Sequence, residues 1–445
     1  MKQILWFRRD LRVSDNAILA NANKDVLPIF IFDKNILEKL PNDDKRVTFI
    51  YKSVLNLKTN LKKLGLDLAI FYDSPKRVFT KLKKDGFDEI LCSIDFDSYS
   101  VNRDKEIEEI LPLNRYLDSF ILNPNEHLKK DQTPYKVFTP FYKSLNPITS
   151  SSKISTYELK NKLNKINFDY SFIPSLETMG FVEQKLPDFL EKNPIELLDI
   201  FKEKIEKYDK ARDYFYMDDT SKISVHLRFG LISPKEVFNY LKSEQNLNSE
   251  SFIRELFWRE FYNYILFHFP SSQTQNFQNI NINWSNNEEH FKKWCRGETG
   301  VPIIDAAMRH LNNTGTIHNR LRMITASFLT KNLFIDWKKG EEYFALKLLD
   351  YEASSNIGSW QWSASTGTDA NPYFRVFNPY SQSKKFDPNA IFIKKVIPEL
   401  RDVNPKLLHI ENGLLEDIFI KYPASIVDIT NSRRQAIQNF KKAKN

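Results

Sequence analysis

The N-terminal third of the chain alternates short hydrophobic runs with stretches in which hydrophobic residues recur at helical spacing. Runs rich in Ile, Val, Leu and Phe predict strands that are buried on both faces, as in a parallel sheet. Residues 45–64 carry apolar side chains three and four positions apart and predict a helix that Gly65 ends. Residues 102–111 predict another helix in the same way. The predicted strands are residues 4–7, 26–32, 68–72 and 89–94.

This alternation predicts an α/β domain with a doubly wound parallel sheet and right-handed crossovers, over residues 1–145. The domain contains neither a G-x-G-x-x-G nor a Walker A sequence. Residues 146–155 (NPITSSSKIS) begin a turn-rich linker that we extend to residue 194. Over residues 195–445 helical spacing dominates, so we expect an all-α C-terminal domain. The helices expected there are residues 234–244, 251–267, 302–312, 317–333 and 340–349.

Composition excludes several classes of protein. The 445 residues are 41% hydrophobic and 27% charged, which is enough apolar surface to form cores rather than a disordered chain. Cys92 and Cys295 make no disulfide framework, and neither sits in a metal-ligand spacing. No apolar run approaches the ~20 residues that span a membrane, and MKQILWFRRDLR has too short an apolar run for a signal peptide. We expect a cytoplasmic protein without metal, whose net charge of +8 is compatible with nucleic acid but does not require it.

One helical face between residues 251 and 268 mixes charges with aromatic rings. Glu255, Trp258, Arg259 and Tyr262 fall at i, i+3, i+4 and i+7 and therefore share this face. Such a face is poor core material. Two interpretations stay open, a solvated edge with a surface ion pair or the polar and aromatic wall of a cleft.

The segment HNRLRM at residues 318–323 places two arginines between apolar residues. Arg320 and Arg322 point to different sides of the expected helix, and they either bind an anion or pair with Asp350 or Glu352. His318 has no metal-ligating partner at a usable spacing, so we expect it to be structural.

Residues 350–369 (DYEASSNIGSWQWSASTGTD) are small, polar and turn-forming around two tryptophans, which favours a planar ligand close to the backbone. Residues 220–224 (TSKIS) offer three hydroxyls, a weak phosphate signal because such clusters are also common helix caps. No nucleophile–base pair, metal cluster or pair of catalytic acids stands out. Chemistry without such groups indicates that a cofactor does the work.

With these segments in this order, the sequence resembles the DNA photolyase/cryptochrome family, and within it the class I cyclobutane pyrimidine dimer photolyases. The resemblance covers essentially the whole chain. The matching segments are WFRRDLRVSDN, YKVFTPFYK, ELFWREFY, GETGVPIIDAAMR, HNRLRMITASFL, DW at 336–337 and WQWSASTGTDANPYFRVFNP.

The resemblance implies a DNA-repair flavoprotein, a carbon–carbon lyase that splits cyclobutane pyrimidine dimers by electron transfer from blue-light-excited FADH⁻. The alternative within the family is a cryptochrome-type photoreceptor that acts through a signalling partner. FAD would lie in a U shape in the helical domain, with Arg322 and Asp350 paired at the isoalloxazine and Asn356 facing flavin N5. The implied FAD-binding residues are Tyr208, Thr220, Ser221, Lys222, Ile223, Ser224, Arg259, Asn319, Arg322, Asp350, Glu352 and Asn356.

The same resemblance implies a DNA site and an electron relay. Glu255, Asn356 and Met323 would be catalytic. A lesion flipped out of the duplex would bind Glu255, Trp258, Asn319, Met323 and Trp362, with Arg212, Arg320 and Arg375 on phosphates. Trp360, Trp337 and Trp284 would photoreduce the flavin from the surface, while Trp294 is expected in the core.

Departures from the family's motifs narrow these expectations. Met323 stands where the (6-4) branch has a His, which argues against (6-4) repair. Arg103 replaces a Glu of the folate-binding relatives, and Gln273 and Thr274 replace their Cys-Lys. The antenna chromophore therefore stays open between methenyltetrahydrofolate, 8-hydroxy-5-deazaflavin, another flavin and none. We expect a monomer that binds UV-damaged DNA, single- or double-stranded, and the end at Asn445 favours the enzyme over a tailed photoreceptor.

Overall fold

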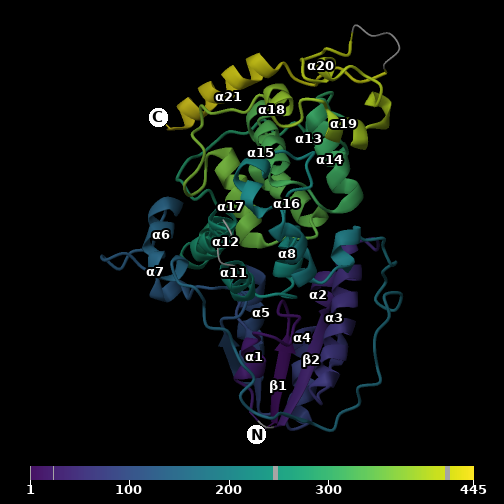
Figure 1. Cartoon of the computed structure of the whole chain (residues 1–445), viewed down its shortest axis with the longest axis vertical. Helices are drawn as coiled ribbons and strands as arrows, with labels where there is room; N and C mark the ends of the chain where they lie inside the picture. The colour runs from purple at the N-terminus through teal and green to yellow at the C-terminus, as the bar shows by residue number, and fades with distance from the viewer. Residues whose placement is uncertain (1, 24, 244–248, 416–420, 445) are drawn as a thin grey trace. The chain divides into compact units, whose positions relative to one another are not determined.

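The computed structural model describes residues 2–23, 25–243, 249–415 and 421–444, which form two compact units (Figure 1). Unit 1 comprises Met1–Tyr135, Thr139–Glu206 and Ser221–Pro270. Unit 2 comprises Lys136–Phe138, Lys207–Thr220 and Ser271–Asn445. Each unit is thus assembled from stretches that are separate in the sequence. The division into residues 1–145, 146–194 and 195–445 stays a prediction.

Unit 1 is built on a parallel sheet with the strand order β3-β2-β1-β4-β5, which confirms the α/β prediction for this part of the chain. The predicted strands are present as β1 (Lys2–Phe7), β2 (Asp25–Asp33), β3 (Ala69–Asp73) and β4 (Glu89–Ser93). Two strands were not predicted, β5 (Leu113–Tyr116) and β6 (Asn164–Lys165), which pairs with β2. Both are short and largely polar, so no hydrophobic run marks them.

Helices cover both faces of this sheet because successive strand residues point to opposite sides. Leu5 and Phe7 of β1 pack with α3 (Lys45–Lys63), whereas Ile4 and Trp6 pack with α4 (Pro75–Lys84). Helix α3 matches its predicted range, and the left-handed Gly65, with φ +76°, follows its end. The predicted helix 102–111 is α5 (Ser98–Glu108), which begins four residues earlier because the Asp97 carboxylate accepts the Ser100 N–H.

The other regular elements of unit 1 are helices, and its Ser221–Pro270 stretch is mostly helical. A tight junction joins this part to β1, since Leu11 N donates to Phe229 O at 3.1 Å and a Cβ on Gly230 would lie 2.1 Å from Arg9 O. Position 230 therefore requires glycine, because its φ is +66° and because the backbone of Arg9 leaves no room for a Cβ. The helices are α1 (Ala17–Ala20), α2 (Lys34–Leu37), η1 (Pro124–Glu126), α6 (Phe138–Ser144), α7 (Asn146–Thr149), η2 (Asp188–Glu191), α8 (Pro194–Lys202), η3 (Ile205–Lys207), α10 (Ser224–Arg228), α11 (Pro234–Ser243) and α12 (Glu250–His268).

Helix prediction in this region succeeded for α11 and α12. The predicted range 234–244 corresponds to α11 (Pro234–Ser243), and Glu244 lies outside the described residues. The predicted range 251–267 corresponds to α12 (Glu250–His268) with one extra residue at each end.

Unit 2 is helical in its described residues and surrounds one large apolar core. With the sheet of unit 1, it confirms the overall fold class, a parallel-sheet α/β domain joined to a helical domain. Its elements are α9 (Tyr208–Ala211), α13 (Glu288–Arg296), α14 (Pro302–Thr314), α15 (Asn319–Ser327), η5 (Phe328–Asn332), α16 (Trp337–Lys347), α17 (Ala353–Ala364), α18 (Pro379–Phe386), α19 (Ile391–Val396), η6 (Pro398–Leu400), α20 (Pro405–Leu408) and α21 (Ile429–Lys444), while η4 (Pro270–Gln273) joins the two units.

Two expectations for unit 2 were wrong. Residues 350–369 were expected to be turn-forming, but α17 occupies Ala353–Ala364, because the segment has no internal proline and the left-handed Ser365 ends the helix only after both tryptophans. The range 317–333 was expected to be one helix. It is divided into α15 and the π-helical turn η5.

Candidate functional site

Helix α15 begins at His318, whose side chain caps the helix. Its Nδ1 accepts the backbone N–H of Arg320 at 3.1 Å. Burial lowers the pKa of His318 to about 4, so the ring is neutral at physiological pH and can accept this bond. His318 has the structural role that the sequence predicted.

Arg322 on α15 pairs with Asp350, which stands between α16 and α17. Its Nη2 donates to both carboxylate oxygens, at 2.7 and 2.9 Å, while its Nε donates to Ile317 O at 3.1 Å. Of the two partners left open by the sequence, the structure selects Asp350. The backbone bond fixes the guanidinium at one end, so the pair presents a positioned donor beside a positioned acceptor.

Asn356 on α17 is held by Glu341 of α16, a residue that the sequence analysis missed. Its Nδ2 donates to the Glu341 Oε1 at 3.0 Å and to the Glu341 backbone carbonyl at 3.2 Å. Tyr351 also donates to this carboxylate, at 3.4 Å. Burial raises the pKa of Glu341, although these hydrogen bonds oppose the shift. The sequence offered no signal for Glu341, because only the packing of α16 on α17 brings it to Asn356.

The donors and acceptors of this cluster fit a flavin. Arg322 supplies N–H donors, Asp350 supplies carboxylate acceptors and Asn356 supplies an amide with both. A flavin ring edge alternates carbonyl oxygens, an N–H group and bare ring nitrogens, so it requires both kinds of partner. Glu352, at the start of α17, is buried in the same unit.

Helices α15 and α17 pack together and carry the half of the expected lesion site that belongs to unit 2. Asn319 Nδ2 lies 4.0 Å from the Met323 sulfur, one turn along α15. Asn319 is exposed, and Met323 and Trp362 are half-buried. These side chains are therefore accessible without being fully solvated, as a binding surface requires.

Gln361 explains why two tryptophans flank a polar residue in WQW. Its buried amide oxygen accepts Phe277 N at 2.8 Å, and its Nε2 donates to Ser272 O at 2.7 Å and to Gln275 O at 3.1 Å. A loop is thereby tied to α17. Gln361 is a second residue that sequence reasoning missed, because its partners are backbone groups of a distant segment.

Two of the three expected relay tryptophans, Trp360 and Trp337, lie against or within α16. Trp360 of α17 is 2% exposed, and a Cβ on Gly340 of α16 would lie 2.3 Å from its ring. Trp337 is the first residue of α16, and its Nε1 donates to Asn276 Oδ1 at 2.8 Å. Gly340 therefore sets how closely Trp360 approaches the helix that Trp337 begins.

Trp284, the third tryptophan expected in the relay, packs against two phenylalanine rings. Its ring is 5.0 Å from Phe334 and 5.9 Å from Phe440, and it is half-buried. The next residue, Ser285, donates its N–H to Phe334 O at 2.9 Å, which holds this segment against the residues just before α16. Trp294, by contrast, is fully buried among Phe344, Trp360 and Phe291, as expected for a core residue.

The three arginines expected on phosphates differ in their surroundings. Arg320 is paired with Asp213 at 2.6 Å, and its guanidinium lies 4.6 Å from the Phe386 ring. Arg212 lies 5.8 Å from the ring of Tyr208, a buried residue that begins α9. Arg375 is exposed, in a loop held by Asn371 Nδ2, which donates to Arg375 O at 2.9 Å.

In unit 1, α12 carries the mixed face predicted from the sequence. Trp258 and Tyr262 lie 5.9 Å apart in a tilted arrangement, and Glu255 and Trp258 are half-buried. Arg259 donates to Ser119 O at 2.8 Å and its guanidinium is 5.4 Å from Phe120. These contacts favour an anchoring role for Arg259.

A different set of α12 side chains fixes this helix within unit 1. Glu260 Oε2 accepts the N–H groups of Ile121 and Leu122 at 3.0 and 3.2 Å. One turn later, the Tyr264 hydroxyl donates to His127 O at 2.8 Å. Sequence reasoning missed this anchoring, because its partners lie in distant segments of unit 1.

The hydroxyl segment 220–224 is divided between the units. Thr220 belongs to unit 2, whereas Ser221, Lys222, Ile223 and Ser224 belong to unit 1. Lys222 has a left-handed backbone, with φ +56°, and its ammonium lies 5.5 Å from the Phe189 ring. Ser224 begins α10, and Ile223 at the N-cap position makes no side-chain capping hydrogen bond.

Two absences hold within residues 2–23, 25–243, 249–415 and 421–444. No helix in these ranges has both the length and the apolar character to cross a membrane. Within the same ranges, His, Cys, Asp and Glu side chains form no group of three that could hold a metal ion.

Comparisons with known proteins match both parts of the chain. Residues 3–157 match the family described as DNA photolyase, and residues 252–442 match the FAD-binding domain of DNA photolyase. A deoxyribodipyrimidine photo-lyase of Alkalihalophilus pseudofirmus is 34% identical, over 98% of this chain and 97% of that protein. An archaeal photolyase of Sulfolobus tokodaii, solved with two FAD molecules, is 33% identical with a TM-score of 0.84, over 99% of this chain and 100% of that chain. A class III photolyase of Agrobacterium tumefaciens is 30% identical with a TM-score of 0.84, over 100% of this chain and 98% of that chain.

Proposed function

The chain belongs to the DNA photolyase family, and from this premise we propose that it binds FAD and uses light to split cyclobutane pyrimidine dimers in DNA. The observation that carries the proposal is the cluster on α15, α16 and α17. Arg322 and Asp350 form a positioned ion pair, and Asn356 presents an amide held by Glu341. This cluster lies inside the region that matches the FAD-binding domain.

Bound FAD would supply the light absorption and the electron that dimer splitting needs. The residues of this chain would bind and orient it. Arg322 and Asp350 would hold the polar edge of the ring, and the neutral Asn356 would face N5 without adding charge. Glu341, which accepts the Asn356 amide N–H, would fix which way that amide points.

We propose lesion-binding roles for five residues. Asn319, Met323 and Trp362 come from unit 2, while Glu255 and Trp258 come from unit 1. The half-buried indoles would stack on the two flipped bases, a contact worth ~1–3 kcal/mol per base. Glu255 would accept a hydrogen bond from the pyrimidine edge, and Arg375, exposed in its loop, would contact phosphate together with Arg212 and Arg320.

Two finer assignments belong to the same proposal. The motif order supports the class I branch, and Met323 supports dimers of the cyclobutane type. An antenna chromophore would bind in unit 1, and the second FAD of the Sulfolobus protein adds a flavin to the candidates folate and deazaflavin. Arg103 weighs against folate. Its guanidinium pairs with Asp104 at 3.0 Å and lies 4.8 Å from the Trp6 ring. A positively charged side chain therefore stands where the folate-binding relatives have a glutamate.

The protein would act as a monomer on DNA, in association with the bacterial nucleoid. The second candidate function is a photoreceptor that signals through a partner. Asn356 favours the repair enzyme, because an acid at this position would favour a protonated flavin radical.

The decisive experiment is illumination of the reduced protein with an oligonucleotide that contains one thymine dimer. We expect intact thymines to reappear in the light and not in the dark. If light restores no thymine while the flavin remains bound and reduced, the repair proposal is wrong and the photoreceptor becomes the better hypothesis.

Glu255 allows a sharper test of the lesion site. Glu255→Gln keeps the side chain's size and removes its charge, so repair at saturating substrate should slow more than binding weakens. Glu250→Gln, on the exposed first turn of the same helix, is the matched control and should leave both unchanged. Equal losses in binding and repair would contradict the role assigned to Glu255.

A further inference from the structure

Helix α21 carries a concentration of positive charge that the proposed site does not use. Residues 429–445 contain five Lys and Arg residues and no Asp or Glu, whereas the whole chain has a net charge of +8. Figure 1 shows α21 as the last helix of unit 2. These residues therefore carry a net charge of +5, the same as the shorter helix α4.

One face of α21 is committed to packing. Ala436 and Phe440 are buried with Ile282 and Phe334, and the Phe440 ring stacks on Tyr373 at 6.3 Å with an interplanar angle of 17°. The ammonium of the buried Lys331 lies 3.5 Å from the centre of the same ring. These contacts fix the rotation of α21 about its axis.

The opposite face is basic and exposed. At 3.6 residues per turn, Arg434 and Lys441 lie almost exactly two turns apart and point away from Ala436 and Phe440. Arg434, Lys441 and Lys442 are all exposed, and no ion pair is described for any of them within the described part of the chain. Their charges are thus available to a partner.

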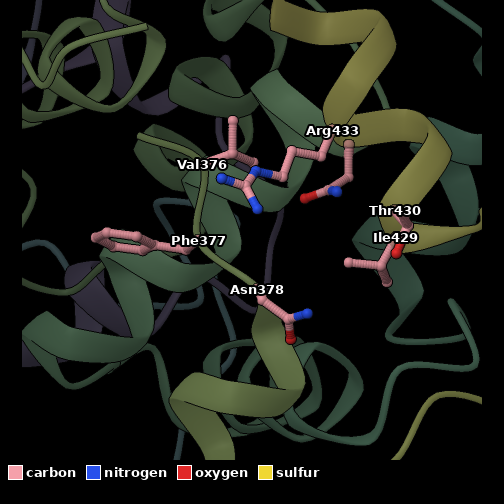
Figure 2. A pocket seen from close by; sticks show the side chains of 7 residues that line it. Val376, Phe377, Asn378, Ile429, Thr430 and Arg433 are labelled. Atoms are coloured by element: carbon pink, nitrogen blue, oxygen red, sulfur yellow. The ribbon is translucent and has the colours of Figure 1, made fainter. Parts of the chain in front are cut away.

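The segment expected to contact DNA packs against α21. Tyr373, which stacks on α21, is two residues from the exposed Arg375. Figure 2 shows Arg433 of α21 beside Val376, and both line a pocket of about 60 Å³ together with Phe377, Asn378 and Thr430. Residues 373–378 and α21 therefore form one continuous surface.

We propose that α21 binds the phosphate backbone of the duplex that flanks the lesion. This inference rests on the proposed function in one respect, the position of the bound DNA at the proposed lesion site. Sixteen residues of helix extend ~24 Å, which corresponds to about seven base pairs of duplex. The helix is long enough to contact several phosphates beyond the flipped dimer.

The residues between the cations favour nucleic acid over other anionic partners. Gln435 and Gln438 are exposed on the same side and can donate amide N–H groups to phosphate oxygens. A membrane-binding helix would present Trp, Phe or Leu beside its cations. On α21 the exposed side chains are polar, and Phe440 is buried.

The test removes three charges from α21 and, separately, three from another helix. One variant combines Arg434→Gln, Lys441→Gln and Lys442→Gln. The matched control combines Lys76→Gln, Lys81→Gln and Lys84→Gln, three exposed cations of α4 in unit 1. Both variants lose the same net charge, and thermal unfolding verifies that both remain folded.

The readout is the dissociation constant for a duplex with one thymine dimer, measured across a range of salt concentrations. Each lost phosphate contact reduces the slope of log K against log salt by about 0.9, so the α21 variant should lose about two to three units of slope. The α4 control should keep the wild-type slope. Single-turnover repair of saturating substrate should be unchanged in both.

Two outcomes would overturn the proposal. An unchanged slope in the α21 variant would mean that this face is simply solvated or serves a protein partner. Equal reductions in both variants would mean that only total charge matters. The same titration with undamaged duplex distinguishes DNA binding by α21 from the proposed repair function. A smaller salt slope for the α21 variant on undamaged duplex supports binding by α21 whether or not the protein repairs dimers.

Discussion

Arginine–carboxylate pairs occur in both units, but they are built differently. In unit 1, Arg12 pairs with Asp118 at 2.8 Å, and the two side chains are 3% and 0% exposed. In unit 2, Arg322 pairs with Asp350 at 2.7 Å, and the two are 28% and 13% exposed. The first pair is closed off from solvent and the second remains accessible.

The two ion pairs differ in their hydrogen-bond partners as well as in their exposure to solvent. Arg12 also donates to the Gly230 carbonyl at 3.2 Å, across the junction where a Cβ on Gly230 would clash with Arg9. The guanidinium therefore links two stretches of unit 1 through its ion pair and its hydrogen bond. Arg322 has only one backbone partner described, the Ile317 carbonyl, and lies in a helix that carries Asn319 and Met323. The closed pair serves the fold, and the open pair is suited to a ligand.

The largest expected effect comes from breaking the closed pair. Arg12→Met would leave the Asp118 carboxylate buried without its counter-charge, which costs about 3–5 kcal/mol of stability. Urea unfolding measures this loss. Arg309→Met is the control, because Arg309 and Glu399 form a more exposed pair, and it should cost about 1 kcal/mol or less. Similar losses for the two variants would contradict the distinction between closed and open pairs.

Breaking the open pair should affect the cofactor more than the fold. Arg322→Met removes a charged donor from the proposed flavin site, worth about 2 kcal/mol or a roughly thirtyfold weaker FAD affinity. Titration of the apoprotein with FAD, followed by flavin fluorescence, measures the dissociation constant. Arg309→Met should bind FAD as the wild type does. An Arg322→Met protein that keeps its FAD affinity but unfolds readily would assign this pair to the fold instead.

A smaller effect separates two tryptophans of unit 2. Trp284→Phe should slow photoreduction of oxidised flavin by about tenfold, equivalent to ~1.4 kcal/mol, and leave repair by chemically reduced protein unchanged. The control is Trp294→Phe, since Trp294 is buried in the core and is not expected in the relay. Photoreduction at the wild-type rate in Trp284→Phe would show that another donor bypasses it.

The sequence predicted the sheet well because its strands are buried on both faces and read as unbroken apolar runs. It missed β5, which is short and half polar at the sheet edge. It also misjudged residues 350–369, since small polar residues resemble a turn, although neighbouring helices hold them helical. Local pattern thus succeeds where burial is uniform and fails where tertiary packing decides.

The candidate site shows the same division. Helical periodicity placed Glu255 and Trp258 on one face of a helix. The Arg322–Asp350 ion pair was one of the interactions that the sequence left open for Arg322. Glu341 and Gln361 were out of reach, because each acts on a residue or loop that only helix packing brings near. The FAD-binding role expected for Arg259 stays a prediction, and its described contacts include Ser119, Phe120 and Glu260.

Per pH unit, the smallest expected effect is a pH dependence of the closed region. Asp10 accepts the Arg8 N–H at 2.7 Å, and burial, followed by the nearby Asp118, raises its pKa, against the opposing charges of Arg12 and Arg8. In the native state Asp10 therefore keeps a proton that it loses in the unfolded chain at pH ~4. The free energy of unfolding falls as the pH rises from the unfolded-state pKa of Asp10 to its folded-state pKa.

Asp10→Asn removes this dependence while its amide oxygen can still accept the Arg8 N–H. The free energy of unfolding of the variant, minus that of the wild type, should therefore grow by about 1 kcal/mol per pH unit inside the window. The other titrating groups, including Asp95, whose pKa Arg9 holds low against burial, cancel in this difference. A difference that stays constant with pH would mean that Asp10 is ionised in the folded protein, and that the closed region tolerates an additional buried charge as readily as the open one.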